Sequence, residues 1–119
     1  MNKPKIKGTT WDRSLRKFFT ERGYEVTRLG EEGSNDLGDI MLHAHTDIVI
    51  EAKNRTQMNI HSVMEKAVAK AQGIPCVVIW KRTVKKPGNS RALPVGVPVV
   101  CMTLETFVNL LNNKDNNND

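Results

Sequence analysis

The fold of this chain is decided by residues 38–53, which read GDIMLHAHTDIVIEAK. The segment holds two apolar runs, 39–42 and 46–52, separated by the short turn His43-Ala44-His45. Runs of this length that are rich in Ile and Val are typical of β-strands, and a connection this short indicates a hairpin. Residues 38–53 therefore predict an antiparallel pair of strands.

A helix and a further strand are predicted before the hairpin. The helix would be capped by Thr9 or Thr10 and would end before Gly23, because threonine is common at the start of helices and glycine just after their end. Apolar side chains recur at i, i+4, i+7 and i+8, which places them on one helix face. They are Trp11, Leu15, Phe18 and Phe19. Residues 24–28 alternate as a strand does, and 29–38 form a polar loop.

Four elements are predicted after the hairpin. Apolar residues at helical spacing indicate a helix over 60–72, followed by a buried strand over 76–80. Residues 83–92 are predicted to be an exposed loop. A last strand over 95–102 contains Pro98, which favours the edge of a sheet. A helix over 104–111 would turn Phe107, Leu110 and Leu111 inward. The order α-β-β-β-α-β-β-α predicts an α/β (α+β) fold, with helices packed on a mixed sheet.

The length of 119 residues predicts one domain. We expect a flexible basic arm over 1–8, the domain over 9–111, and a disordered polar tail over 112–119. Cys76 and Cys101 lie in apolar runs, so we expect buried, reduced thiols. No apolar run is long enough to cross a bilayer, and the N-terminus lacks a secretion signal. These features predict a cytoplasmic protein without a membrane partner.

The charge of the chain favours a polyanionic partner. Lys and Arg number 18 against 13 Asp and Glu, for a net charge of +5. Basic side chains that neutralise phosphates release condensed counterions, so nucleic acid is the expected partner. The alternative is a basic protein whose charge only keeps it in solution, which charge alone does not exclude.

Three side chains in the hairpin carry the predicted chemistry. Glu51 and Lys53 are two residues apart on a strand and therefore point to the same face. Asp39 opens the neighbouring strand and can lie beside Glu51. Two carboxylates with a backbone carbonyl, for which Ala52 is the candidate, suit Mg²⁺, and Mn²⁺ as its substitute. Lys53 would orient the attacking water and offset charge on a phosphate. The alternative is an ordinary salt bridge between Glu51 and Lys53.

These residues resemble the PD-(D/E)XK nuclease superfamily, with Gly38-Asp39 and Glu51-Ala52-Lys53 as the motif. The likeness is greatest to archaeal-type Holliday junction resolvases and RecB-like phage nucleases, over 11–82. Asp12 and Gly23-Tyr24 match an acidic residue early in the first helix and a glycine-aromatic step. The family usually has Glu in place of Asp12 and Pro in place of Gly38.

The resemblance implies a restriction-endonuclease-like fold and an activity. The expected function is a metal-dependent DNA endonuclease that hydrolyses phosphodiester bonds and selects branched DNA, inside a phage-infected or prokaryotic cell. Two symmetric cuts in a junction would require a homodimer. The alternatives are a non-catalytic DNA-binding module on the same fold, and a nicking or mismatch endonuclease.

Several other residues are candidates for the site. Asp12 could be a third metal ligand, or an acid stabilised by the helix dipole. Ser34 could contact the site, as a loop serine does in similar resolvases, or only form a turn. Basic residues around the site could form a DNA-binding rim, or be a solvated surface. They are Arg55, Lys81, Arg82, Lys85, Lys86 and Arg91.

Overall fold

The computed structural model describes residues 3–30, 37–88 and 91–112 of the chain. Within these ranges the elements are, in order, α1 (Lys3–Glu21), β1 (Glu25–Arg28), β2 (Ile40–His43), β3 (Asp47–Asn54), α2 (Ile60–Ala71), β4 (Cys76–Lys81), β5 (Thr83–Lys85), β6 (Ala92–Pro94), β7 (Val99–Cys101) and α3 (Leu104–Asn112). None of these helices has the length and apolar character that crossing a bilayer requires.

The described strands form one mixed sheet and one small hairpin. The sheet has the order β1-β2-β3-β4-β7, and β5 pairs with β6. The predicted hairpin is confirmed: β2 and β3 are antiparallel, with Ile40 opposite Ile50. Helix α2 makes the crossover to β4, which runs parallel to β3. Strand β7 pairs with β4 at the edge of the sheet, as Pro98 predicted. The predicted element order and mixed α+β class are therefore confirmed.

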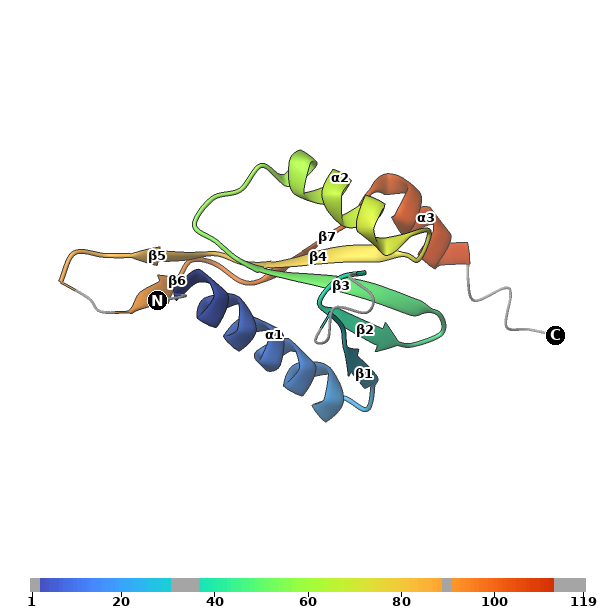
Figure 1. Ribbon diagram of the computed structural model, residues 1–119, viewed down its shortest axis with the longest axis horizontal. Helices are drawn as coiled ribbons and strands as arrows, with labels where there is room; N and C mark the ends of the chain where they lie inside the picture. The colour runs from blue at the N-terminus through green and yellow to red at the C-terminus, as the bar shows by residue number, and fades with distance from the viewer. Residues whose placement is uncertain (1–2, 31–36, 89–90, 113–119) are drawn as a thin grey trace.

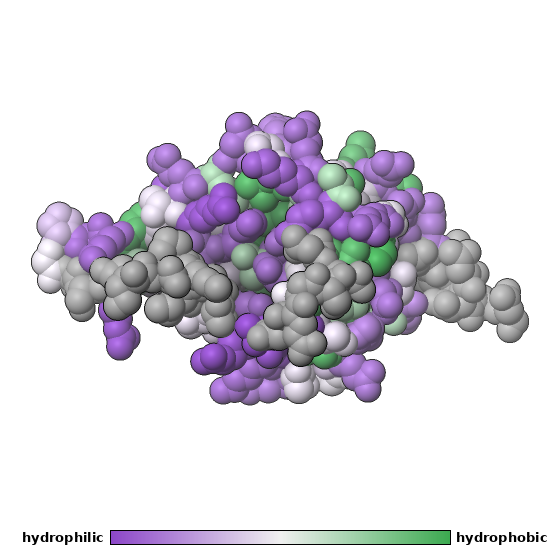
Figure 2. Space-filling model, viewed as in Figure 1, coloured by the Kyte–Doolittle hydropathy of each residue, from purple (hydrophilic) through white to green (hydrophobic). Residues whose placement is uncertain are grey.

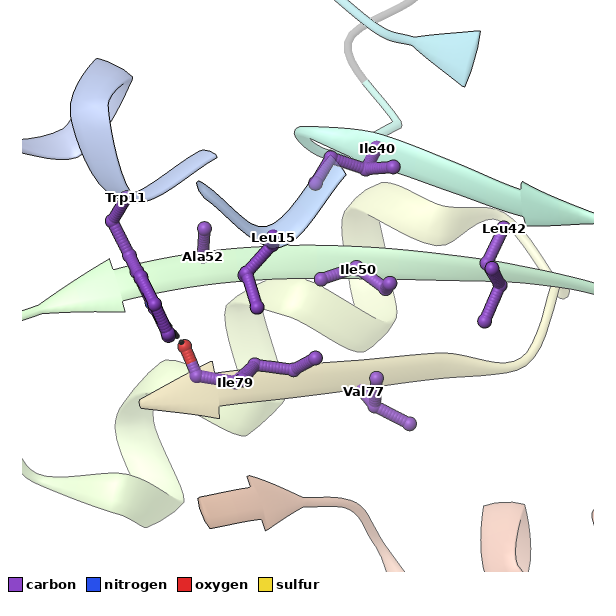
Figure 3. Close-up of a cluster of buried hydrophobic side chains, with 8 residues drawn as sticks. All are labelled: Trp11, Leu15, Ile40, Leu42, Ile50, Ala52, Val77 and Ile79. Atoms are coloured by element: carbon purple, nitrogen blue, oxygen red, sulfur yellow. Dashed lines mark hydrogen bonds between the residues drawn. The ribbon is translucent and has the colours of Figure 1, made fainter. Parts of the chain in front are cut away.

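Helices cover both faces of the sheet, with α1 on one side and α2 and α3 on the other (Figure 1). The core under α1 comprises Trp11, Leu15, Ile40, Leu42, Ile50, Ala52, Val77 and Ile79 (Figure 3). The Trp11 indole N–H also donates to the Ile79 carbonyl at 3.1 Å, so its polar atom is satisfied within the core. The core under α2 comprises Met41, Val49, Met64, Ala67, Ala71, Cys76 and Val78. Both cysteines are free thiols, with Cys76 buried and Cys101 half-buried.

Helix α1 is longer than predicted. It begins at Lys3 and runs through the expected cap at Thr9 or Thr10, so residues 3–8 are helical instead of a flexible arm. Pro4 falls in the first helical turn, where the missing N–H has no intrahelical acceptor in any case. Phe18 was predicted to face the core but is 45% exposed, and its ring lies 3.6 Å from the Arg22 guanidinium carbon.

The segment predicted as a loop over 83–92 contains β5 and leads into β6. These strands form a hairpin that extends past the end of the main sheet (Figure 1). The side chain of Thr83 is buried and donates to the Asn54 Oδ1 at 2.8 Å, which ties the start of the hairpin to the end of β3. The strand predicted over 95–102 is shortened to β7, because Pro98 has no N–H for a sheet ladder.

The inward orientation predicted for α3 is wrong for two of its three residues. Phe107 is 48% exposed and Leu111 is 60% exposed, whereas Leu110 is half-buried. Helix α3 lies at the edge of the sheet, beyond β7 and beside α2, where the described residues provide no further layer to cover it (Figure 1). Hydrophobic residues accordingly reach the surface in the region of α3 (Figure 2). The tail over 113–119 lies outside the described residues.

Candidate active site

The β2–β3 hairpin brings two acidic side chains together. The Asp39 N–H donates to the Ile50 carbonyl at 3.0 Å, which extends the β2–β3 pairing by one residue and sets Asp39 beside Glu51. The Asp39 Oδ2 also accepts a hydrogen bond from the Ala52 N–H at 2.8 Å. Glu51 is only 4% exposed. The predicted pair of carboxylates on adjacent strands is therefore present.

Burial and a neighbouring negative charge make Asp39 hard to ionise. Loss of solvent is the largest cause, followed by the charge of Glu51, and together they raise the Asp39 pKa from 3.8 to about 6. The Ala52 N–H opposes the rise, while a hydrogen bond with Glu51 and the charge of Asp12 add to it. A cation bound beside Asp39 would favour the ionised form of this carboxyl group.

Gly38 allows this close approach. A Cβ on residue 38 would clash with the Val49 Cγ1 and would lie 3.9 Å from the Glu51 Oε2. Val49 is fully buried and β-branched, so its methyl group has no room to move aside. A glycine at position 38 is therefore required by the space available.

Lys70 is a site residue that the sequence interpretation missed. Its Nζ lies 2.7 Å from the Glu51 Oε2, and the Glu51 side chain is 5% exposed. This ammonium group neutralises the buried carboxylate, which would otherwise lose its hydration without compensation. Lys70 borders the buried face of α2, three residues after Ala67 and one before Ala71. The sequence signal that could have identified Lys70 as a site residue is a lysine next to the buried face of a helix, in a chain that places an acidic residue on the neighbouring strand.

Asp12, on α1, forms an ion pair with Arg16 and lies near enough for its charge to act on Asp39. It is 8% exposed, and its Oδ1 accepts from the Arg16 Nε at 2.8 Å. Among the described residues, no group of three or more His, Cys, Asp or Glu side chains is placed to hold a metal ion. The structure thus joins Asp39 with Glu51, and the role of Asp12 as a third ligand stays a prediction.

Lys53 lines a cleft between the end of β3 and α2, which we call the β3–α2 cleft. Its volume is about 270 Å³. Its lining residues are Glu51, Lys53, Arg55, Asn59, Ser62, Val63, Lys66, Ala67 and Lys70. Lys53 and Glu51 share this side of the sheet, as their spacing predicted, and four of the nine lining residues are basic.

Hydrogen bonds fix the segment that carries Arg55. The Arg55 carbonyl accepts from the Trp80 indole N–H at 2.9 Å, and its N–H donates to the Lys81 carbonyl at 3.3 Å. Next to it, the Thr56 hydroxyl donates to the Thr83 carbonyl at 2.7 Å. Arg55 is therefore attached to an anchored backbone at the mouth of the cleft.

The other basic residues predicted for a DNA-binding rim are not among the residues that line the cleft. Lys81 is placed over the Trp11 ring, 5.2 Å from its centroid, and the Arg82 Nε donates to the Thr56 carbonyl at 2.8 Å. The remaining three belong to the β5–β6 hairpin or its flanks and are exposed: Lys85, Lys86 and Arg91. Of the predicted rim, only Arg55 is among the described residues that line the cleft. Ser34 lies outside the described residues.

The donors at the acidic pair fit a hard divalent cation. Carboxylate oxygens of Asp39 and Glu51 are the ligand type that Mg²⁺ prefers, and a cation beside them would relieve the repulsion that raises the Asp39 pKa. The Ala52 contact seen at the site is its N–H to Asp39. In comparisons with known proteins, no family model matches this chain, and no curated protein matches it.

Proposed function

We propose that this chain is a metal-dependent endonuclease that hydrolyses phosphodiester bonds in DNA. The proposal depends on one observation above all: Asp39 and Glu51 lie side by side on adjacent strands, with Lys53 on the same side of the sheet as Glu51. A carboxylate pair next to a cleft with four basic residues suits a polyanion and the cation that its hydrolysis needs.

Each residue of the group has a task in this reaction. Asp39 and Glu51 would hold Mg²⁺ or Mn²⁺, with the Ala52 carbonyl as a further candidate ligand. When bound, the cation polarises a phosphoryl oxygen and lowers the pKa of a bound water. Lys53 would donate hydrogen bonds to the phosphate and offset the negative charge that grows during attack. The Ala52 N–H keeps the Asp39 carboxylate in its place.

The preference for branched DNA is proposed from the resemblance to junction resolvases, and it requires two active sites in a symmetric dimer. An exposed apolar surface on α3, beside the edge strand β7, supports such a dimer. It comprises Leu104, Phe107, Val108 and Leu111, with exposures from 44% to 79%. Apolar surface beside an edge strand is typical of protein contacts. Light scattering should give a dimer mass for the unmodified protein and a monomer mass for Val108→Asp. An unchanged mass would place the contact elsewhere.

One observation favours a different function. Lys70 already neutralises Glu51, and the described residues contain no three-acid group that could hold a metal. A non-catalytic DNA-binding module on this fold would also have these features. Such a module would bind DNA and cut none, whereas a nicking or mismatch endonuclease would cut one strand.

Cleavage assays separate these functions. Four-way junction and linear duplex DNA would be incubated with the protein and Mg²⁺ or Mn²⁺, or with a chelator. We expect metal-dependent cutting that Asp39→Asn and Glu51→Gln abolish while DNA binding survives. The matched control is Asp47→Asn, which removes an exposed acid from the same strand, with a side chain 57% exposed. Equal cutting by Glu51→Gln and the unmodified protein would refute the assigned role.

A further inference from the structure

The β3–α2 cleft collects positive charge from two separate elements. Lys53 and Arg55 come from β3 and the segment after it, and Lys66 and Lys70 come from α2. Glu51 is the one acidic residue among the lining residues. Lys70 pairs with this glutamate at 2.7 Å, so the charges of the other three basic residues are left for a ligand.

The packing of the protein holds these charges close together. Five of the nine lining residues come from one side of α2 at helical spacing, at positions 62, 63, 66, 67 and 70, and Ala67 among them is buried. Like charges directed into one hollow repel one another, and an anion bound there would remove this repulsion. The cleft therefore has the charge of an anion site.

A phosphate group fits the donors of this cleft. Arg55 offers a planar guanidinium, which binds phosphate through paired hydrogen bonds, and Lys66 adds a point charge from the opposite wall. Asn59 and Ser62 add polar groups at the start of α2, where the Asn59 Oδ1 accepts from the Ser62 N–H at 3.1 Å. A volume of about 270 Å³ is sufficient for a phosphate and part of its sugar.

We propose that the β3–α2 cleft binds a backbone phosphate of the DNA strand, next to the phosphodiester that is cut, through Arg55 and Lys66. The assignment depends on the proposed nuclease function for its substrate class. Because Glu51 forms part of the cleft wall, a strand held there passes the acidic pair on β2 and β3. The strand path then follows α2 and not the β5–β6 hairpin.

DNA binding in a chelator tests the cleft without any cleavage. Fluorescence anisotropy with a short labelled duplex would compare the unmodified protein with Lys66→Ala and Arg55→Ala across a series of salt concentrations. Both side chains are exposed, so the fold should survive, and circular dichroism would verify this. The matched control is Lys17→Ala, which removes one helix lysine from α1 on the other face, with a side chain 77% exposed.

We expect each cleft variant to bind several-fold more weakly, and the slope of log affinity against log salt to fall by about 0.9 for each lost phosphate contact. Lys17→Ala should keep the affinity and slope of the unmodified protein. Unchanged affinity in both cleft variants would overturn the proposal, as would an equal loss in Lys17→Ala. Weaker binding by the cleft variants, in a protein that cuts no DNA with any metal, would uphold the cleft and refute the nuclease.

Discussion

Asp39→Asn should make the metal-free protein more stable, although it should destroy activity. The substitution removes one negative charge from the buried pair that Asp39 forms with Glu51. The asparagine Oδ1 can still accept from the Ala52 N–H, so the hydrogen bond that positions the side chain can persist. The change therefore removes the cost of burying the Asp39 charge and the repulsion by Glu51.

The size and sign of the effect follow from the Asp39 pKa. The folded protein raises this pKa from 3.8 to about 6, so the folded state holds the proton more tightly than the unfolded state does. Stability falls as the pH rises through this window, and above about pH 6 the full loss amounts to about 3 kcal/mol. Asparagine does not ionise and escapes this loss. We expect a gain of about 1–3 kcal/mol at about pH 8, and none at about pH 3.5.

Urea unfolding at several pH values, in a chelator, measures this difference. The control is Asp47→Asn, whose exposed side chain pairs with His43 at the surface and should change stability by at most about 1 kcal/mol at any pH. Equal or lower stability of Asp39→Asn at about pH 8 would refute the reasoning. So would a gain that stays the same at every pH, because a pH-independent effect cannot arise from ionisation.

Three further substitutions test the packing around the site. Gly38→Ala should lower the free energy of unfolding in urea by about 1–3 kcal/mol, because the new methyl group clashes with Val49. A variant as stable as the unmodified protein would contradict this. Trp11→Phe removes the indole N–H that donates to the buried Ile79 carbonyl of β4. The loss of this hydrogen bond should lower the free energy of unfolding by about 1–3 kcal/mol, in addition to the effect of the smaller ring. Lys70→Met leaves the Glu51 carboxylate buried without its cation, so in a chelator the protein should unfold at a lower temperature than the unmodified protein. Adding Mg²⁺ should restore part of the lost thermal stability. No restoration by Mg²⁺ would argue against a metal at Glu51.

The hairpin and its acidic pair could be predicted because they depend on local rules. Strand alternation fixes which face each residue of β3 takes, and the short turn fixes the pairing with β2. Ile50 is therefore buried under α1, while Val49 lies under α2. The same rules predict that Asp39 lies beside Glu51.

The features that were missed depend on how distant elements pack. The pairing of Lys70 with Glu51 depends on how α2 packs against β3, and residue spacing in the sequence does not reveal this packing. Lys85, Lys86 and Arg91 were predicted to belong to a rim, but they lie in the β5–β6 hairpin or beside its strands, and this hairpin extends past the end of the main sheet (Figure 1). Phe107 follows an amphipathic pattern, yet the described chain supplies nothing to cover it.

Alternate residues of strand β3 face the core under α1 and the candidate site on the opposite side. Ile50 and Ala52 pack under α1, and Glu51 between them faces Lys70 on the opposite side. A slip of β3 by one residue against β4 would exchange these two sets, because successive side chains of a strand point to opposite faces of the sheet. The charged groups would then enter the apolar layer beneath Trp11, and the aliphatic groups would line the β3–α2 cleft. The register of this one strand therefore determines both the packing of the core and the charge of the cleft.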